Sequence, residues 1–282
     1  MKKIFFAIFL CITFTSFVFS NNYVQRIVSL VPAITETIFA INAQNQLVAR
    51  TDFCNFPIES KNIPSVGGFD GKSISIEKIL SYKPDLVCIA DGMHNHLIKS
   101  LENFGIKVFI SSAQNISDIF SEIKNLAELT GHQQEAELCI NKIKKQLTQA
   151  ESLMKSQSTN KLRVYWEISS NPFFTCGSKS FISDILQILG VQNIFSDIDK
   201  SYIQVNEESI IKRQPDIILF PDYHANNTVT HIKNRKNWQH VPAVSNSKIY
   251  PVDSDLFSRP GPRIGDMALE LAKVFIQPDK GI

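Results

Sequence analysis

Short apolar runs alternate with segments of helical periodicity along most of the chain. Runs such as RIVSLV (26–31), DLVCIA (85–90), KVFIS (107–111) and DIILFP (216–221) are typical of buried strands. Between them, AITETIFAI, SIEKILSYK and FISDILQILG place apolar residues at the three- and four-residue spacing of helices. This alternation predicts an α/β fold with mainly parallel sheets covered by helices.

The alternation stops in the middle of the chain. Residues 116–156 show helical periodicity interrupted at Gly131, without a strand signal. The part from residue 132 on could form one helix roughly 37 Å long, enough to cross a whole lobe. We therefore predict two Rossmann-like lobes, residues 22–131 and 160–276, joined by a single long rigid helix at 132–157, with a ligand cleft between the lobes.

The first 20 residues have the composition of a signal peptide. Two lysines precede a nearly unbroken apolar stretch, and small residues stand before a polar segment that begins at Asn21. We expect export to the periplasm. An uncleaved anchor is an alternative, and a lipid anchor at Cys11 on the outer face of the membrane is another, although Leu10 before it is larger than a lipobox usually has.

One sequence unit occurs once in each predicted lobe. Glu77 and Glu208 each lie seven residues before a proline, which leads through an aspartate into an apolar strand. A glutamate in the first turn of a helix is favoured by the helix dipole, with Ser75 or Asn206 as N-cap, and this could be its whole role. The matched pair also offers two carboxylates to a two-fold symmetric partner that presents arginines.

Composition and motifs exclude several classes of function. With 29 basic and 27 acidic residues and no basic run, the chain lacks the electrostatic footprint of a nucleic-acid binder. The sequence contains no GxSxG, P-loop, HExxH or GxGxxG motif, so hydrolase, nucleotide and zinc-protease interpretations lack their defining residues. An exported scaffold or adhesion protein remains an alternative.

Four cysteines would remain after cleavage of the signal peptide: Cys54, Cys88, Cys139 and Cys176. An oxidising compartment permits disulfides among them, and their pairing stays open. Cys88 and Cys139 lie in apolar patterns typical of buried thiols. Cys54 and Cys176 could also approach across the crevice as a nucleophile or redox pair.

Several longer stretches carry a family resemblance: SLVPAITE, DFCNFP, VGGFDGKSISIEKILSYKPDLV, NPFFTCGSKSFISDILQILGVQNIF, VNEESIIKRQPDIIL and SDLFSRPGPRI. From residue 26 to about residue 276 the chain resembles the substrate-binding proteins of ABC importers with a rigid helical linker, and within them the periplasmic cobalamin-binding proteins. The resemblance implies a monomeric binding protein, without enzymatic activity or catalytic cofactor, that carries a corrinoid to a permease dimer with its ATPase. It also implies that Glu77 and Glu208 dock on arginines of the two permease subunits.

The same resemblance implies a set of ligand-binding residues, with aromatic rings lining the cleft and polar residues at its edge: Phe53, Phe69, Phe174, Tyr202, Phe257, Asp255 and Arg259. Aromatic rings can cover the wide, flat, partly apolar face of a corrin, and polar groups can orient its amide side arms. Core packing is the alternative for each aromatic residue. Phe69 and Tyr202 stand where the best-known cobalamin binders have Trp, which is a departure from the family pattern.

Relatives with this architecture also bind haem or iron siderophores, and these are the alternative ligands. His94, His96 and His224 follow predicted strands in loops that should border the crevice, where His94 and His224 could supply axial ligands to a metal. Solvent-exposed loop histidines are the alternative. Siderophore sites often use several arginines, and here only Arg259, with Arg263 as a candidate, is available.

Overall fold

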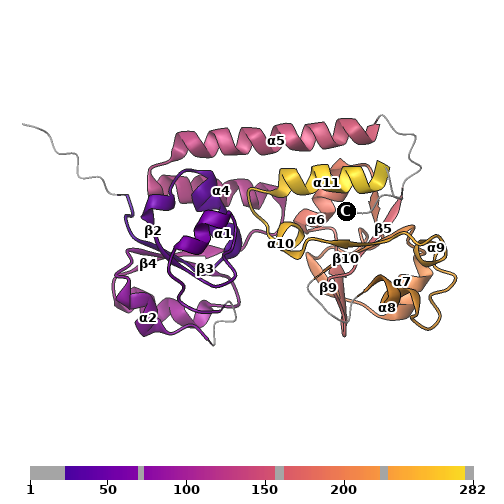
Figure 1. Ribbon diagram of the computed structural model, residues 1–282, viewed down its shortest axis with the longest axis horizontal. Coiled ribbons are helices and arrows are strands. Elements are labelled where there is room, and N and C mark those ends of the chain that lie inside the picture. The colour runs from indigo at the N-terminus through magenta and orange to yellow at the C-terminus, as the bar shows by residue number, and fades with distance from the viewer. Residues whose placement is uncertain (1–22, 69–72, 156–161, 223–227, 277–282) are drawn as a thin grey trace, which may run out of the picture.

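The computed structural model describes residues 23–68, 73–155, 162–222 and 228–276 (Figure 1). Two parallel sheets, each at the centre of one lobe, confirm the predicted fold class. The first lobe has the strand order β2–β1–β3–β4, with β1 at Ile27–Ser29, β2 at Leu47–Arg50, β3 at Leu86–Ala90 and β4 at Lys107–Ser111. Its helices are α1 (Pro32–Ala40), α2 (Ile76–Ser81), α3 (Ile98–Asn103) and α4 (Ile116–Thr130), with 3-10 turns at Gln44–Gln46, Ile58–Asn62 and Asn95–Leu97.

The second lobe has the strand order β11–β10–β5–β8, again all parallel. Its strands are β5 (Arg163–Trp166), β8 (Gln192–Asn193), β10 (Ile217–Pro221) and β11 (Ile249–Val252). Its helices are α6 (Phe181–Ile188), α7 (Glu207–Lys212), α8 (Val229–Lys233), α9 (Pro242–Ser245), α10 (Ser254–Ser258) and α11 (Ile264–Ile276).

A small antiparallel sheet in the second lobe has no counterpart among the predicted elements. It has the order β6–β7–β9, with β6 at Ser169–Ser170, β7 at Phe173–Cys176 and β9 at Tyr202–Gln204. Its strands are only two to four residues long and several of their side chains remain accessible, so the sequence shows no clear apolar run there.

The backbone helix α5 spans Gln133–Lys155 and begins just after Gly131, whose left-handed φ of 83° ends α4. Figure 1 shows α5 running along both lobes, with α11 beside it over the second lobe. It packs on α1 and α4 of the first lobe and on α6 and α11 of the second. One buried stripe makes these contacts: Ala136, Ile140, Ile143, Leu147, Ala150 and Met154.

The repeated unit of the sequence has the same structure in both lobes. Asp85, just before β3, accepts the backbone N–H of Arg26 at 2.9 Å, and Asp216, just before β10, accepts that of Arg163 at 2.9 Å. In each lobe this aspartate therefore satisfies a backbone donor where the neighbouring strand begins. The proline–aspartate pair thus has a structural role in both lobes, separate from that of the glutamates.

Matched buried residues hold the two glutamate helices on their sheets. Ile79 of α2 and Ile210 of α7 are both fully buried, each two positions after the glutamate of its helix. Burying one such side chain contributes about 1.5–3 kcal/mol. The first turn of each helix is therefore fixed to a rigid sheet.

The lobes also touch near the start of α4, apart from the contacts of α5. The backbone N–H of Ile116 donates to the Asp184 carboxylate of α6 at 3.0 Å, and the backbone N–H of Phe181 donates to the carbonyl of Gln114.

None of the helices in the described segments combines the length and apolar character that crossing a membrane requires. The predicted signal peptide, residues 1–20, lies outside the described residues.

Candidate functional site

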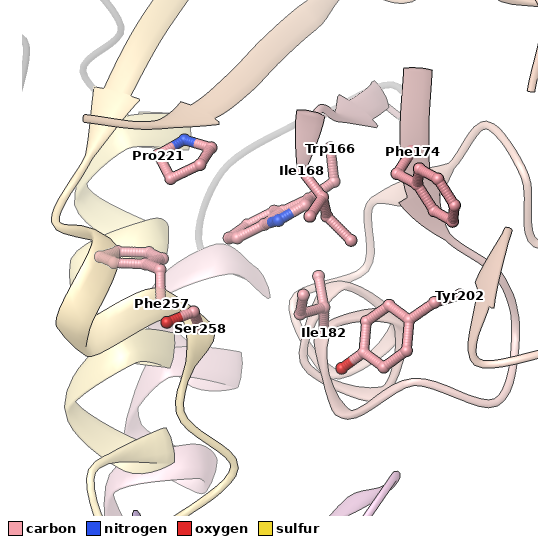
Figure 2. Close-up of a pocket in the computed structure, with 8 residues that line it drawn as sticks. All are labelled: Trp166, Ile168, Phe174, Ile182, Tyr202, Pro221, Phe257 and Ser258. Carbon is pink, nitrogen blue, oxygen red and sulfur yellow. The ribbon is translucent and has the colours of Figure 1, made fainter. Parts of the chain in front are cut away.

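An apolar cavity of about 340 Å³ lies at the carboxyl ends of β5 and β10, whose last residues, Trp166 and Pro221, both line it. Ligands of α/β proteins usually bind at this edge of a parallel sheet. Figure 2 shows the side chains of α10 on one side of the cavity and those of the small antiparallel sheet on the other, with the indole of Trp166 between them. The lining consists of Trp166, Ile168, Phe174, Ile182, Tyr202, Pro221, Phe257 and Ser258.

The small sheet places two of these aromatic side chains on one face. In its register Cys176 pairs with Tyr202 and Phe174 pairs with Gln204. Because alternate residues of a strand point to the same side, Phe174 and Tyr202 are diagonal neighbours on the face toward the cavity. Tyr202 keeps 41% of its surface exposed and is thus available for contact with a bound molecule.

Trp166 and Phe257 form the back of the cavity. Their rings stack with centroids 5.9 Å apart and an interplanar angle of 30°, and both residues are buried. Such pairs contribute about 0.5–1.5 kcal/mol beyond the burial of their area. These two residues therefore belong to the core as well as to the cavity wall.

A second cavity of about 410 Å³ lies between the lobes. The first lobe contributes Val31, Pro32, Ala33 and Phe53, and the second contributes Ser254, Asp255, Ser258, Arg259 and Pro260. Ser258 lines both cavities, so they adjoin, and we call them together the cleft. Phe53 is 56% exposed and is the large apolar side chain that the first lobe presents there.

A closed ring of hydrogen bonds joins the two lobes in the cleft. Arg259 donates to the amide oxygen of Asn55 at 2.9 Å and to one carboxylate oxygen of Asp255, and Asn55 donates to the other oxygen at 2.7 Å. Asn55 comes from the first lobe, whereas Asp255 and Arg259 come from the second. We call these three residues the polar ring. It sets charged and amide groups beside the apolar cavity.

The structure brings the described members of the predicted ligand set together in one cleft. Phe174, Tyr202 and Phe257 line its apolar part, and Phe53, Asp255 and Arg259 line its inter-lobe part. Phe69 lies outside the described residues. That these side chains bind a ligand stays a prediction.

Several residues of the cleft were not predicted from the sequence, among them Trp166, Asn55 and Pro221. Trp166 stands near the end of the run RVYWEI, which is apolar enough to suggest a strand, and the carboxyl end of a parallel strand is where ligands of α/β proteins usually bind. Asn55 lies within the quoted stretch DFCNFP, but only its contact with Asp255 shows its role. Pro221 likewise ends an apolar strand.

The interpretation of His94 as an exposed residue or axial ligand bordering the crevice is wrong. Its side chain is fully buried, and its Nδ1 accepts the backbone N–H of Ala90 at 3.1 Å. The imidazole therefore helps to close the turn after β3. His96 is exposed in the following 3-10 turn, and His224 lies outside the described residues.

The two predicted docking glutamates occupy equivalent places, each at the second residue of its helix and each exposed to solvent. The N-caps are Ser75 and Asn206, as expected. Ser75 also donates to Glu77 at 2.6 Å, and this hydrogen bond lowers the pKa of the Glu77 carboxyl. Figure 1 shows α2 and α7 on the side of the molecule away from α5. The two helices that carry these glutamates thus lie on a side of the molecule that the backbone helix leaves open.

The second-lobe glutamate has extra support behind the cavity wall. Glu167, between two cavity residues in the sequence, forms a buried, doubly hydrogen-bonded ion pair with Arg235. Arg235 lies 4.7 Å from the ring centroid of Trp238, and the indole N–H of Trp238 donates to Glu207 at 2.6 Å. Glu207 immediately precedes Glu208. The start of α7 is therefore tied to the back of the cavity wall.

The cysteines of the described residues, Cys54, Cys88, Cys139 and Cys176, are free thiols. Burial raises the pKa of each, that of Cys176 to about 12. Reactive cysteines have lowered pKa values and partial exposure, so the interpretation of Cys54 and Cys176 as a catalytic or redox pair is wrong. Among the residues that the structure describes, no three His, Cys, Asp or Glu side chains are grouped to hold a metal ion.

Comparisons with known proteins agree with this architecture. A family described as "Periplasmic binding protein" matches residues 27–256. The chain is 28% identical to the vitamin B12-binding protein of Vibrio parahaemolyticus, over 98% of this chain and 97% of that one. A protein of Staphylococcus epidermidis, described as a possible iron-binding (periplasmic solute-binding) protein, has 28% identity and a TM-score of 0.79 over 89% of this chain and 98% of that one. The periplasmic vitamin B12 binding protein of Vibrio cholerae, at 24% identity, shares the fold with a TM-score of 0.72 over 90% and 97%.

Proposed function

Because the chain belongs to the periplasmic binding protein family, we propose that it is exported, captures a corrinoid such as vitamin B12 in the cleft and delivers it to an ABC importer. The observation that carries this proposal is the aromatic cavity with the polar ring beside it. The similarity to a protein named vitamin B12-binding protein supports the same ligand. In this role the chain catalyses no reaction and binds as a monomer.

The cleft suits the two kinds of surface that a corrinoid presents. Tyr202 and Phe174 offer ring faces to the flat macrocycle, at a low entropic cost because each ring has few rotatable bonds. The half-buried carboxylate of Asp255 and the amide of Asn55 can exchange hydrogen bonds with amide side arms. An apolar cavity with a few orienting polar groups is the usual design of a small-molecule site.

Delivery requires contact with the permease, and Glu77 and Glu208 are the groups proposed for it. A permease dimer with two-fold symmetry presents the same surface twice, so the arginines that the family resemblance implies would face the two lobes in matching positions. Hydrogen bonds between arginine and carboxylate are among the strongest polar contacts, and the fork of a guanidinium matches a carboxylate geometrically. The ATPase of the importer supplies the energy for transport.

The direct test is calorimetry of the purified mature protein with cyanocobalamin, cobinamide, haemin and a ferric siderophore. We expect a corrinoid to bind with a dissociation constant below about 1 μM, equivalent to about −8.2 kcal/mol. Absence of corrinoid binding together with tight haemin binding would contradict the proposed ligand. The fold and the proposed docking surface would then still apply, but with haem as the transported ligand.

A further inference from the structure

A buried carboxylate lies behind the polar ring, on the first lobe. Glu36 of α1 accepts two hydrogen bonds from Arg263, at 2.8 Å from Nε and 2.7 Å from Nη2, and one from Nη1 of Arg259 at 2.8 Å. Both arginines belong to the second lobe, 223 and 227 residues away in the sequence. A single carboxylate thus joins two cations across the lobe boundary.

The charges in this cluster depend on one another because little water reaches them. The exposed fraction of the side chain is 1% for Glu36, 8% for Arg259 and 15% for Arg263. With Asp255, the cluster contains two positive and two negative groups and is neutral. Burial acts to lower the pKa of Arg263, but the hydrogen bonds and charge of Glu36 outweigh it and raise that pKa. Without Glu36, two buried guanidinium groups would share one carboxylate.

Packing around the cluster fixes the second-lobe segment on the first lobe. The guanidinium of Arg263 lies 4.0 Å from the ring centroid of Phe56. Gly261 passes so close to α1 that an added Cβ would lie 3.3 Å from Ala33. The segment that contains Arg259 and Arg263 is therefore held against α1 by both contact and charge.

We propose that Glu36 is a positioning residue of the cleft. It holds Arg259 from the side away from the cleft, so that other N–H groups of Arg259 donate to Asn55 and Asp255 in the polar ring and to the carbonyl of Phe53. It thereby fixes the groups that meet the polar side of the ligand, and it sets the spacing of the lobes before a ligand arrives. Preorganisation of this kind improves affinity because binding does not have to order the site. The role in ligand recognition rests on the proposed function, whereas the effect on the polar ring does not.

The first arm of the test needs no ligand. In ¹H–¹⁵N spectra of the full mature protein, the Nε–H of Arg263 should exchange slowly with water because Glu36 accepts it. Glu36→Gln should quicken this exchange at least about tenfold, as expected when a buried charged hydrogen bond is lost. Glu122→Gln is the matched control, since that half-buried carboxylate accepts hydrogen bonds from Ser111 and Ala113 elsewhere in the first lobe. Equal exchange in all three proteins would overturn the proposal.

The second arm measures cyanocobalamin affinity on variants that remain folded by circular dichroism. Glu36→Gln should weaken binding roughly 10- to 100-fold, the range for breaking a buried charged hydrogen bond. Glu36→Asp, which keeps the charge, should recover part of the loss, and Glu122→Gln should bind like the wild type. In an Arg259→Gln background, Glu36→Gln should have little further effect, because both changes act through one guanidinium.

The results of these two arms distinguish the positioning role of Glu36 from the proposed binding of a corrinoid. A lowered melting temperature in Glu36→Gln with unchanged affinity would assign Glu36 a purely structural role and overturn the proposal. If Glu36→Gln does not fold, Glu36→Asp and Arg263→Gln carry the same comparison, with weaker binding than the Glu122→Gln control expected for both. If the wild type binds no corrinoid, the proposed function fails, while the exchange of the Arg263 Nε–H still decides whether Glu36 orders the arginine segment behind the polar ring.

Discussion

The two lobes share the unit that carries the glutamates and differ in the wall that they present to the cleft. In both, an N-capped helix with an exposed glutamate leads through a residue of left-handed φ, Lys83 or Gln214, and a proline–aspartate pair into a buried strand. Within the described parts of the two lobes, only the second adds the small antiparallel sheet that supplies Phe174 and Tyr202. The repeated part therefore suits a symmetric partner, and the unrepeated part suits an asymmetric ligand.

The glutamate helices themselves are supported unequally. In α7 the first residue, Glu207, accepts the indole N–H of Trp238 and so connects to the back of the cavity wall. In α2 the first residue is Ile76, and Glu77 is held by Ser75. Equivalent positions in the sequence can thus be exposed in the same way and yet be fixed by different parts of the fold.

The largest effect is expected from removing both glutamates. Glu77→Ala combined with Glu208→Ala should abolish transport of labelled cobalamin through the reconstituted importer, because the proposed charged contacts with the permease would be lost. Corrinoid affinity measured by calorimetry should stay unchanged, since both side chains lie outside the cleft. A loss of affinity in this variant would contradict the division between a docking face and a ligand wall.

Trp166→Ala should strongly reduce the stability of the second lobe. Trp166 is buried and stacks on Phe257, so its truncation leaves a cavity and should lower the free energy of unfolding by about 3–5 kcal/mol. Tyr202→Ala, at an exposed position, should cost much less. Denaturant unfolding of the two variants makes the comparison, and equal losses would show that the back and front of the wall are not distinct.

The two walls of the cleft should differ in their contribution to affinity. Tyr202→Ala should weaken corrinoid binding about tenfold, equivalent to about 1.4 kcal/mol, because Tyr202 and Phe174 form one aromatic surface. Phe53→Ala should have a smaller effect, since Phe53 projects from the other lobe at the inter-lobe cavity. Calorimetry on both variants tests this order, and a larger loss for Phe53→Ala would reverse the assignment of the walls.

The smallest effect concerns the charge of Glu77. Its folded-state pKa is lowered from 4.5 by the hydrogen bond from Ser75, so the carboxylate stays charged to a lower pH than an ordinary glutamate does. Because the pKa in the folded state lies below that in the unfolded state, the interaction of the charged carboxylate contributes its full stability above the unfolded-state pKa. This contribution is lost as the pH falls through the folded-state pKa. Ser75→Ala should move the carboxyl titration of Glu77, followed by ¹³C NMR, to higher pH. An unmoved titration would show that Ser75 does not set this charge.

Much of the architecture could be predicted because burial repeats at the spacing of each element. The runs around β3 and β10 are apolar throughout because both faces of a parallel sheet are covered. The stripe of α5 repeats every three to four residues, which shows one long helix with one covered side. The strands of the small sheet are too short and too accessible to leave such a pattern.

The details of the cleft depend on contacts between distant parts of the chain. Nothing near Glu36 in the sequence distinguishes it from any helix glutamate, because its two partners come from the other lobe. The burial of His94 is set by how the turn after β3 folds back on Ala90, which local composition does not show. The aromatic residues of the cleft were predicted from family resemblance, and only the structure shows that Trp166 joins them.

In the function proposed here, ligand recognition and permease docking use separate surfaces, with the ligand held between the lobes. The most direct measurement is calorimetry of cyanocobalamin with two double variants, Phe53→Ala with Tyr202→Ala and Glu77→Ala with Glu208→Ala. We expect the first to bind at least tenfold more weakly than the wild type, on the basis of about 1.4 kcal/mol for each factor of ten, and the second to bind as tightly as the wild type. Wild-type affinity in the cleft variant, or weakened affinity in the glutamate variant, would contradict the account.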